Sequence, residues 1–138
     1  MIRNIALVLL AISTASLAQK RFDSGELKGF TQSPTEHMIM DIEKPFTVTV
    51  VQGIVLLDDG YHDPLREVIF EIRGPGKAEK VRGTKTDDNG QFRMPNVPEG
   101  TYKFKATLDG YQSVVGTIIV SRDADRRNAI KIDMSVGV

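Results

Sequence analysis

Tyr-Lys-Phe-Lys-Ala-Thr-Leu, residues 102–108, is the stretch of sequence that decides the fold class of this chain. Apolar residues alternate with lysine or threonine throughout, and Asp109-Gly110 ends the pattern. A repeat of two places every second side chain on one face of a β-strand, whereas a helix repeats its apolar residues at spacings of three and four. The stretch therefore predicts a strand with one buried and one polar face.

The same alternation recurs from position 46 to the end of the chain. Turn-forming glycine, proline, asparagine and aspartate separate the alternating segments. No long helical period occurs outside the first eighteen residues. The pattern predicts an all-β domain of about seven strands, an antiparallel sandwich or barrel, with strand segments at residues 46–50, 54–57, 68–73, 81–86, 92–94, 102–108, 114–120 and 130–136.

The apolar faces of these strands are expected to pack against one another as two sheets. Asn89-Gly90 favours the tight turn of a hairpin, because both residue types tolerate a positive φ. The core should be dominated by five aromatic residues, Phe46, Phe70, Phe92, Tyr102 and Phe104.

The composition is that of an ordinary soluble domain, with 138 residues, 41% hydrophobic and 26% charged. Its 18 Lys and Arg balance its 18 Asp and Glu. Since nucleic-acid binding needs a basic excess, nucleic acid is not an expected partner. The chain has no cysteine, which excludes disulfides, thiol nucleophiles and Cys-ligated zinc.

Residues 1–18 have the organisation of a secretory signal peptide. Arg3 precedes a short apolar run, and Ser16-Leu-Ala18 supplies the small residues that a signal peptidase reads. The run is too short to cross a bilayer of about 30 Å as a helix, so no membrane span is expected after cleavage. A buried or membrane-anchoring helix is the alternative. Cleavage after Ala18 leaves 120 residues with a net charge of −1.

The predicted compartment follows from the signal peptide and the missing cysteines together. An exported domain without disulfides must be stabilised by its core, and about 120 residues suffice for one. These features favour a bacterial exported protein, either periplasmic, at the cell surface or secreted.

Residues 19–45 are polar and lack a clear period, which predicts an N-terminal extension or linker. Within it, residues 38–42 (Met-Ile-Met-Asp-Ile) form a short apolar island. The island is expected to form an edge strand or to pack over the core. Docking of the extension on a partner is the alternative.

Two acidic turns, at residues 58–63 and 87–90, are candidate cation sites. Calcium takes about six to eight oxygen ligands, and neither turn resembles the spaced loop that supplies them. Acidic residues also favour turns by accepting hydrogen bonds from nearby backbone amides. No bound metal or other cofactor is therefore predicted. The weak metal candidates are Asp58, Asp59, Asp87, Asp88 and Asn89, and the first turn also contains His62 and Asp63.

The residues do not predict catalysis. Nucleophilic hydrolysis needs a nucleophile, a base and a group that orients the base. His37 in the extension and His62 in a turn are the two imidazoles of the chain, and neither a G-x-S-x-G nor an H-E-x-x-H motif occurs. The prediction is a protein that is not an enzyme.

Surface recognition is the remaining function class. Sugar-binding surfaces commonly use an exposed aromatic ring, and without tryptophan the candidate glycan contacts are Tyr61 and its neighbour His62, since Tyr111 is expected to be structural. Edge strands offer a protein contact by strand addition. The charged loop at residues 122–127 is expected to be solvated, with a protein contact as the alternative.

Four motifs occur in one order and spacing over about residues 48–136. They are Gly53-Ile-Val-Leu-Leu-Asp-Asp-Gly60 followed by Val68-Ile-Phe-Glu-Ile72, Thr84-Lys-Thr-Asp-Asp-Asn-Gly-Gln-Phe92, Val97-Pro-Glu-Gly-Thr-Tyr102, and Asp109-Gly-Tyr111. Together they resemble the carboxypeptidase regulatory-like domain. The chain departs from the family pattern at Arg66-Glu67 and in a first turn lengthened by residues 61–63.

The resemblance implies a seven-stranded, antiparallel, Greek-key β-sandwich of the transthyretin-like (prealbumin-like) type, placed here at residues 46–138. It also implies a non-catalytic module of an exported or surface protein. The predicted function is protein interaction, or a structural role, in the bacterial cell envelope. A carbohydrate-binding module of the envelope or extracellular space is the alternative.

Overall fold

The computed structural model describes residues 27–34, 38–74 and 80–137. Its regular elements are strands, which confirms the all-β prediction. Among the described residues no helix has the length and apolar character needed to cross a membrane. The predicted signal peptide, residues 1–18, lies outside the described part of the chain.

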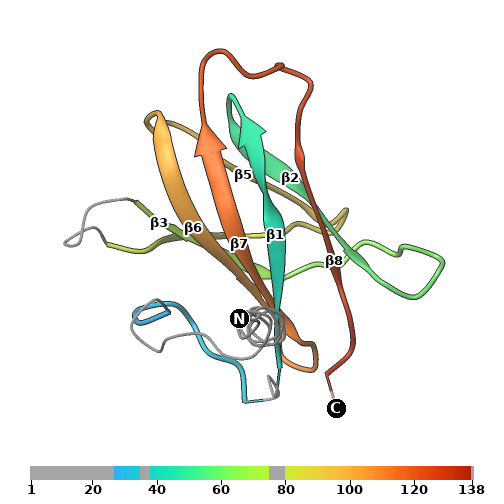
Figure 1. Cartoon of the computed structure of the whole chain (residues 1–138). Helices are drawn as coiled ribbons and strands as arrows, with labels where there is room; N and C mark the ends of the chain where they lie inside the picture. The colour runs from blue at the N-terminus through green and yellow to red at the C-terminus, as the bar shows by residue number, and fades with distance from the viewer. Residues whose placement is uncertain (1–26, 35–37, 75–79, 138) are drawn as a thin grey trace, which may run out of the picture.

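The strands form two facing sheets (Figure 1). One sheet has five strands in the order β1-β7-β6-β3-β4, and the other has three in the order β5-β2-β8. The predicted two-sheet sandwich is therefore confirmed. The strand bounds are β1 (Ile39–Val48), β2 (Val51–Leu57), β3 (Ile69–Arg73), β4 (Arg82–Lys85), β5 (Gln91–Met94), β6 (Gly100–Thr107), β7 (Ser113–Val120) and β8 (Ile130–Met134).

Two details of the predicted architecture are wrong. The described residues form eight strands, as many as the alternating segments but one more than the resemblance implies, and the sheets are mixed, because β1 pairs with β7 and β2 with β8 in parallel. Half-buried parallel and antiparallel strands show the same alternation, so the sequence pattern could not separate them. The parallel pairs arise because the chain bends at Thr49-Val50 and places β1 and β2 in different sheets.

Strand β1 contains most of the apolar island and runs through the position predicted as the start of the domain, residue 46. Its register shifts between Ile42 and Phe46, where three residues lie opposite Thr117. Pro45 lies in this bulge, which accommodates a residue with no N–H to donate to the ladder. The island is therefore an edge strand, which is one of the two expected outcomes.

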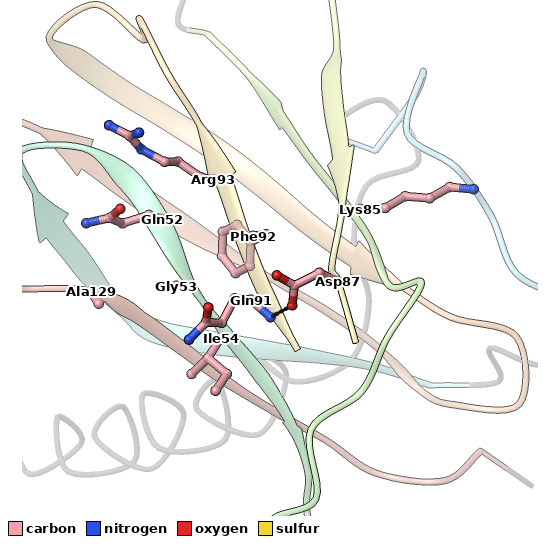
Figure 2. A pocket seen from close by; sticks show the side chains of 9 residues that line it. All are labelled: Gln52, Gly53, Ile54, Lys85, Asp87, Gln91, Phe92, Arg93 and Ala129. Carbon is pink, nitrogen blue, oxygen red and sulfur yellow. Dashed lines mark hydrogen bonds between the residues drawn. The ribbon is translucent and has the colours of Figure 1, made fainter. Parts of the chain in front are cut away.

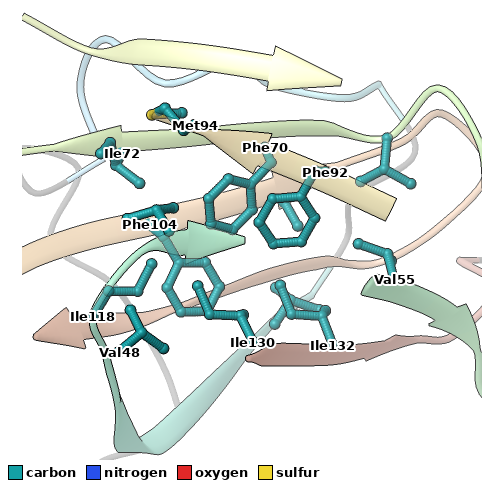
Figure 3. Packing of buried hydrophobic residues seen from close by; sticks show 14 of the residues in the cluster. Val48, Val55, Phe70, Ile72, Phe92, Met94, Phe104, Ile118, Ile130 and Ile132 are labelled. Carbon is teal, nitrogen blue, oxygen red and sulfur yellow. The ribbon is translucent and has the colours of Figure 1, made fainter. Parts of the chain in front are cut away.

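The core lies between the two sheets and is built around three aromatic rings (Figure 3). Phe70 on β3 stacks on Phe92 of the opposite sheet, with ring centroids 4.1 Å apart, and on Phe104 of β6, at 5.6 Å. These three predicted core residues are buried, whereas Phe46 and Tyr102 are only partly buried at its margin. The Phe46 ring still lies 6.0 Å from that of Phe104.

Gly116 on β7 makes room for the Phe104 ring. The two residues are register partners on β7 and β6. A Cβ atom at position 116 would lie 2.6 Å from Cε2 and 2.9 Å from Cζ of Phe104, closer than such atoms approach in real proteins. A glycine weakens a strand unless another group needs the space, and here the central ring of the core occupies it.

Gly116→Ala is expected to destabilise the protein by about 1–3 kcal/mol, because the new methyl group overpacks the core against Phe104. The same substitution in a Phe104→Leu background should cost less, because the narrower side chain can yield. Urea unfolding of the four chains measures both costs as a double-mutant cycle. An equal cost in the two backgrounds would show that the glycine serves another purpose.

Candidate functional site

The first acidic turn, residues 58–63, is held by hydrogen bonds to its own backbone. Oδ1 of Asp59 accepts hydrogen bonds from the amides of Tyr61, at 2.9 Å, and His62, at 3.1 Å. The amide of Asp58 donates to the carbonyl of Met134 at the end of β8. His62 has a φ of 58°, which fits the tight bend. Asp59 thus has the backbone role that its residue type favours in turns.

The second acidic turn joins β4 to β5 and has the same design. Oδ1 of Asp87 accepts from the amides of Asn89 and Gln91, each at 2.9 Å. Asp88 points outward and forms an exposed ion pair with Arg66, at 3.6 Å. Gly90 has a φ of 75°, and a Cβ atom there would lie 2.7 Å from the carbonyl oxygen of Val55. The turn is therefore shaped by close packing on β2.

The two turns do not combine their predicted ligands into one cluster. Within the described residues, no group of three or more His, Asp or Glu side chains is placed to hold a metal ion. One carboxylate oxygen in each turn, Oδ1 of Asp59 and Oδ1 of Asp87, already accepts two backbone hydrogen bonds. The geometry of both turns follows from these bonds.

Thr86 has a positioning role that the sequence reasoning missed. Its buried hydroxyl donates to the carbonyl of Leu65, at 2.7 Å, and accepts from the amide of Val68, at 2.9 Å. These bonds fix the segment that follows the first turn against the start of the hairpin. The sequence signal for this role is the second threonine of the Thr84–Phe92 motif, directly before the acidic turn.

A polar hollow of about 620 Å³ lies on the outer side of the three-stranded sheet (Figure 2). It spans β2 and β5 and reaches the end of β4. Its groups can donate and accept hydrogen bonds, and Phe92 contributes the only aromatic ring, which is buried. Gln52, Gln91 and Arg93 are the lining side chains with groups that can bond a ligand, because Lys85 points away from them (Figure 2) and pairs with Glu67 at 3.8 Å.

Tyr61 does not line this hollow. It is 83% exposed on the first turn, with His62 and Asp63 also exposed beside it. Tyr111 is half-buried, forms a bridge with Val136 and packs against the core, in agreement with its expected structural role. The predicted sugar contact and the polar hollow are therefore separate features.

The side of the sandwich between β1 and β8 is open because five strands face three. The edge strands β4 and β5 contact each other through their hairpin, which aligns the two sheets at that edge. Because the larger sheet has more strands, β1 extends beyond the smaller sheet at the opposite edge, and we call this the overhang of β1. On the core-facing side of β1, Ile42 and Phe46 are half-buried and Met40 is 48% exposed. A hollow of about 520 Å³ lies here, between β1 and the start of β8. A hydrogen bond of 3.0 Å from Asn128 Nδ2 to the carbonyl of Thr47 ties β1 to the segment before β8.

Exposed apolar residues continue this opening at its other end. Ile39 pairs with Ser113, and Val136 bridges Tyr111, so Met38 and Val136 both lie near the start of β7. Met38 is 61% exposed and Val136 is 58% exposed. Of the four large hydrophobic residues that are exposed in the described chain, three lie in this region. We call it the open side of the sandwich, and it comprises Met38, Met40, Ile42, Phe46 and Val136.

The charged loop before β8 is organised by its own ion pair. The guanidinium of Arg127 donates to the carboxylate of Asp125 from Nε, at 3.1 Å, and from Nη2, at 2.9 Å. The backbone amide of Arg127 donates to the same carboxylate at 2.9 Å. The guanidinium bond first, and the amide bond second, hold the pKa of Asp125 below its usual value. The loop is exposed, as predicted.

His62 is the one histidine in the described ranges and is exposed on a turn, whereas His37 lies outside these ranges. The two hollows described above differ in the side chains that border them: amide and charged side chains border the first, and Ile42, Pro45, Phe46 and Val48 border the second.

Comparison with solved structures finds chlorocatechol dioxygenases at low identity. The crystal structure of 3-chlorocatechol 1,2-dioxygenase from Rhodococcus opacus 1CP is 13% identical, with a TM-score of 0.47, and the match covers 91% of this chain and 78% of that one. Chlorocatechol 1,2-dioxygenase from Pseudomonas putida is 11% identical, with a TM-score of 0.44, covering 96% and 85%. No curated protein sequence matches the chain.

The family comparison covers most of the sandwich. The model of the carboxypeptidase regulatory-like domain matches residues 50–135, from the bend before β2 to just beyond β8. This range contains the four motifs on which the resemblance was based, and it confirms that assignment. The chain belongs to the carboxypeptidase regulatory-like domain family.

Proposed function

We propose that this protein is an exported, non-catalytic β-sandwich module that binds a protein of the bacterial cell envelope through the open side of the sandwich. The observation that carries the proposal is the overhang of β1. Its core-facing residues Met40, Ile42 and Phe46 have no strand of the second sheet directly opposite them, and they remain half-buried or exposed. Exposed apolar side chains that gather near one sheet edge favour a protein contact there.

The edges beside the opening suit a partner that contributes a β-strand. β1 and β8 are edge strands, and each presents backbone N–H and C=O groups on its outer side. Lys44 and Pro45 protect only the bulged middle of β1. A strand added at either edge would satisfy these groups and cover the apolar row, which is the mode of strand addition.

We also infer that the sandwich is a variant of the transthyretin-like, Greek-key arrangement that the family implies. Without β1, the two sheets contain four and three strands. β1 would then be an addition to a seven-stranded module, which places the opening at the one strand outside the common arrangement.

Substitution of Met40 by lysine is expected to weaken binding of the envelope partner about tenfold or more, because it places a charge in the centre of the apolar contact. The measurement is quantitative cross-linking of the full chain to solubilised envelope proteins. Gln52→Lys, which adds the same charge on the outer face of β2, is the matched control and should bind normally. Equal capture by the two variants would contradict a contact at the open side.

Export is supported by the residues at 1–18. We expect a bacterial host to release a mature chain that starts at Gln19, whose mass is measured in the periplasmic and culture fractions. Ala18→Trp should leave the precursor unprocessed, because the bulky ring cannot replace the small residue at the cleavage position. An intact N-terminus on soluble protein of the wild-type sequence would contradict the proposal.

A carbohydrate-binding module is the second candidate, and the polar hollow favours it. Gln52, Gln91 and Arg93 offer amide and guanidinium groups on adjacent strands that can bond sugar hydroxyls. On a glycan array, binding that is lost in Arg93→Ala and kept in Met40→Lys would support this site. Loss in Tyr61→Ala alone would place the sugar on the first turn instead. Arrays without reproducible binding would exclude this candidate.

A further inference from the structure

Residues 27–34, Leu-Lys-Gly-Phe-Thr-Gln-Ser-Pro, pack on the outer face of the five-stranded sheet, away from the core and from the open side. We call this segment the strap. It crosses β3 and β6, whose outward residues Glu71 and Lys105 are register partners. Alternation along β6 predicts that Lys105 faces solvent, yet it is 1% exposed, and Glu71 is 8% exposed. The strap covers a face that would otherwise be polar and wet.

The centre of the strap is held by polar contacts on both sides of one residue. The amide of Thr31 donates to Oε1 of Glu71, at 2.9 Å, and its hydroxyl donates to Oε2, at 3.0 Å. The carbonyl of Thr31 accepts from Nζ of Lys105, at 2.7 Å, and from the hydroxyl of Thr107, at 3.5 Å. The backbone N–H and C=O of Thr31 are thus both hydrogen-bonded to side chains of the sheet.

The residues on either side of Thr31 add an anchor and an end point. Phe30 is 5% exposed, and the guanidinium carbon of Arg73 lies 5.0 Å from its ring centroid. Arg73 also donates to the carbonyl of Lys28. At the other end of the strap, the hydroxyl of Ser33 donates a hydrogen bond to Oδ1 of Asp109, at 3.1 Å. The strap therefore turns over residues 27–30, where the amide of Phe30 donates to the carbonyl of Leu27, and continues from Thr31 toward Asp109.

A hollow of about 360 Å³ lies beside Arg73 on the same sheet. It is lined by Arg73, Gly74, Thr101, Tyr102, Lys103 and Thr117. Arg73 also contacts the strap, so the hollow and the strap are neighbours on this side of the sandwich.

Burial of a lysine and a glutamate is costly unless their charges are compensated. Apolar side chains on this face would have held a purely structural segment at lower cost. The groups present instead match a peptide backbone, with an acceptor for N–H, a donor for C=O and a cation over an aromatic ring. This complementarity to one backbone residue and its neighbouring ring is what recognition of a peptide requires.

We propose that the outer face of β3 and β6 is a peptide-binding site for a segment that ends a turn at phenylalanine and continues with threonine, and that the strap of this chain occupies it as an internal ligand. The site is distinct from the open side and does not depend on the proposed envelope partner. Its ligand in the experiment is the strap sequence itself.

The test uses the full chain with Phe30→Ala and Thr31→Pro together. The first change removes the aromatic anchor, and the second removes the N–H that Glu71 accepts. A fluorescein-labelled peptide with the sequence of residues 27–34 is then titrated, and its anisotropy is followed. The released variant should bind the peptide at least about tenfold more tightly than the wild type, whose own strap competes at a high effective concentration.

Three controls identify the binding surface. A peptide with Gln32→Ala, a neighbouring exposed position, should bind as well as the strap sequence, whereas a peptide with Phe30→Ala should lose at least about tenfold in affinity. Lys105→Met in the released variant should also abolish binding. A folded released variant that binds no peptide would overturn the proposal, as would equal binding by wild type and variant.

A second measurement covers the case in which the double variant does not fold. Acylation of lysines by an N-hydroxysuccinimide ester is followed by mass spectrometry, with exposed Lys85 as the internal reference. Lys105 should be protected in the wild type, should react in the milder Phe30→Ala variant, and should regain protection when excess peptide is added. If Lys105 reacts as readily as Lys85 in the wild type, or if added peptide restores no protection, the proposal fails.

Discussion

The contact between Phe104 and Gly116 is the constraint on which the sandwich depends. The ring occupies the place of a side chain on the neighbouring strand and thereby reaches Phe70 and Phe46 on either side. Phe70 in turn stacks on Phe92 of the other sheet, so one continuous row of rings joins both layers. Aromatic rings of this size supply much of the apolar area that a small core without disulfides must bury.

This row also explains where the molecule is open. The rings fill the space between β3, β6 and the second sheet, and they end at Phe46 on β1, which is only partly covered. A ninth strand opposite β1 would close the sandwich, but β8 is an edge among the described residues. The core is centred on β3 and β6, so the apolar residues of β1, Met40, Ile42 and Phe46, lie at its margin. Their exposure follows from the five-to-three ratio of strands.

Period-two alternation was enough to predict the strands, the two-layer core and the three central rings, because each depends on which face of a strand is apolar. The alternation could not predict parallel pairing at β1 and β8, since the pattern is the same for both directions.

The alternation also predicted the wrong environment for Glu71 and Lys105 on the outer face, because a charged residue on the side away from the core is normally in water. The strap that covers them has no period, and its contacts to Glu71 and Lys105 are made partly by backbone atoms that sequence patterns do not display. The acidic turns were located correctly, and their hydrogen bonds are those that the residue types favour.

The strap and the open side lie on different surfaces, but the chain connects them over a short distance. Pro34 ends the strap and Met38 begins the apolar row, so three residues separate them. Four Cα-to-Cα steps span at most about 15 Å, and the hydrogen bond of Ser33 to Asp109 fixes the near end of that span beside the β6–β7 turn. β7 starts just beyond this turn, with Ile39 paired to Ser113. The first residues of β1 are themselves held at the sheet edge by their pairing with β7. The peptide site and the open side are therefore separate surfaces, each fixed by its own contacts with the five-stranded sheet.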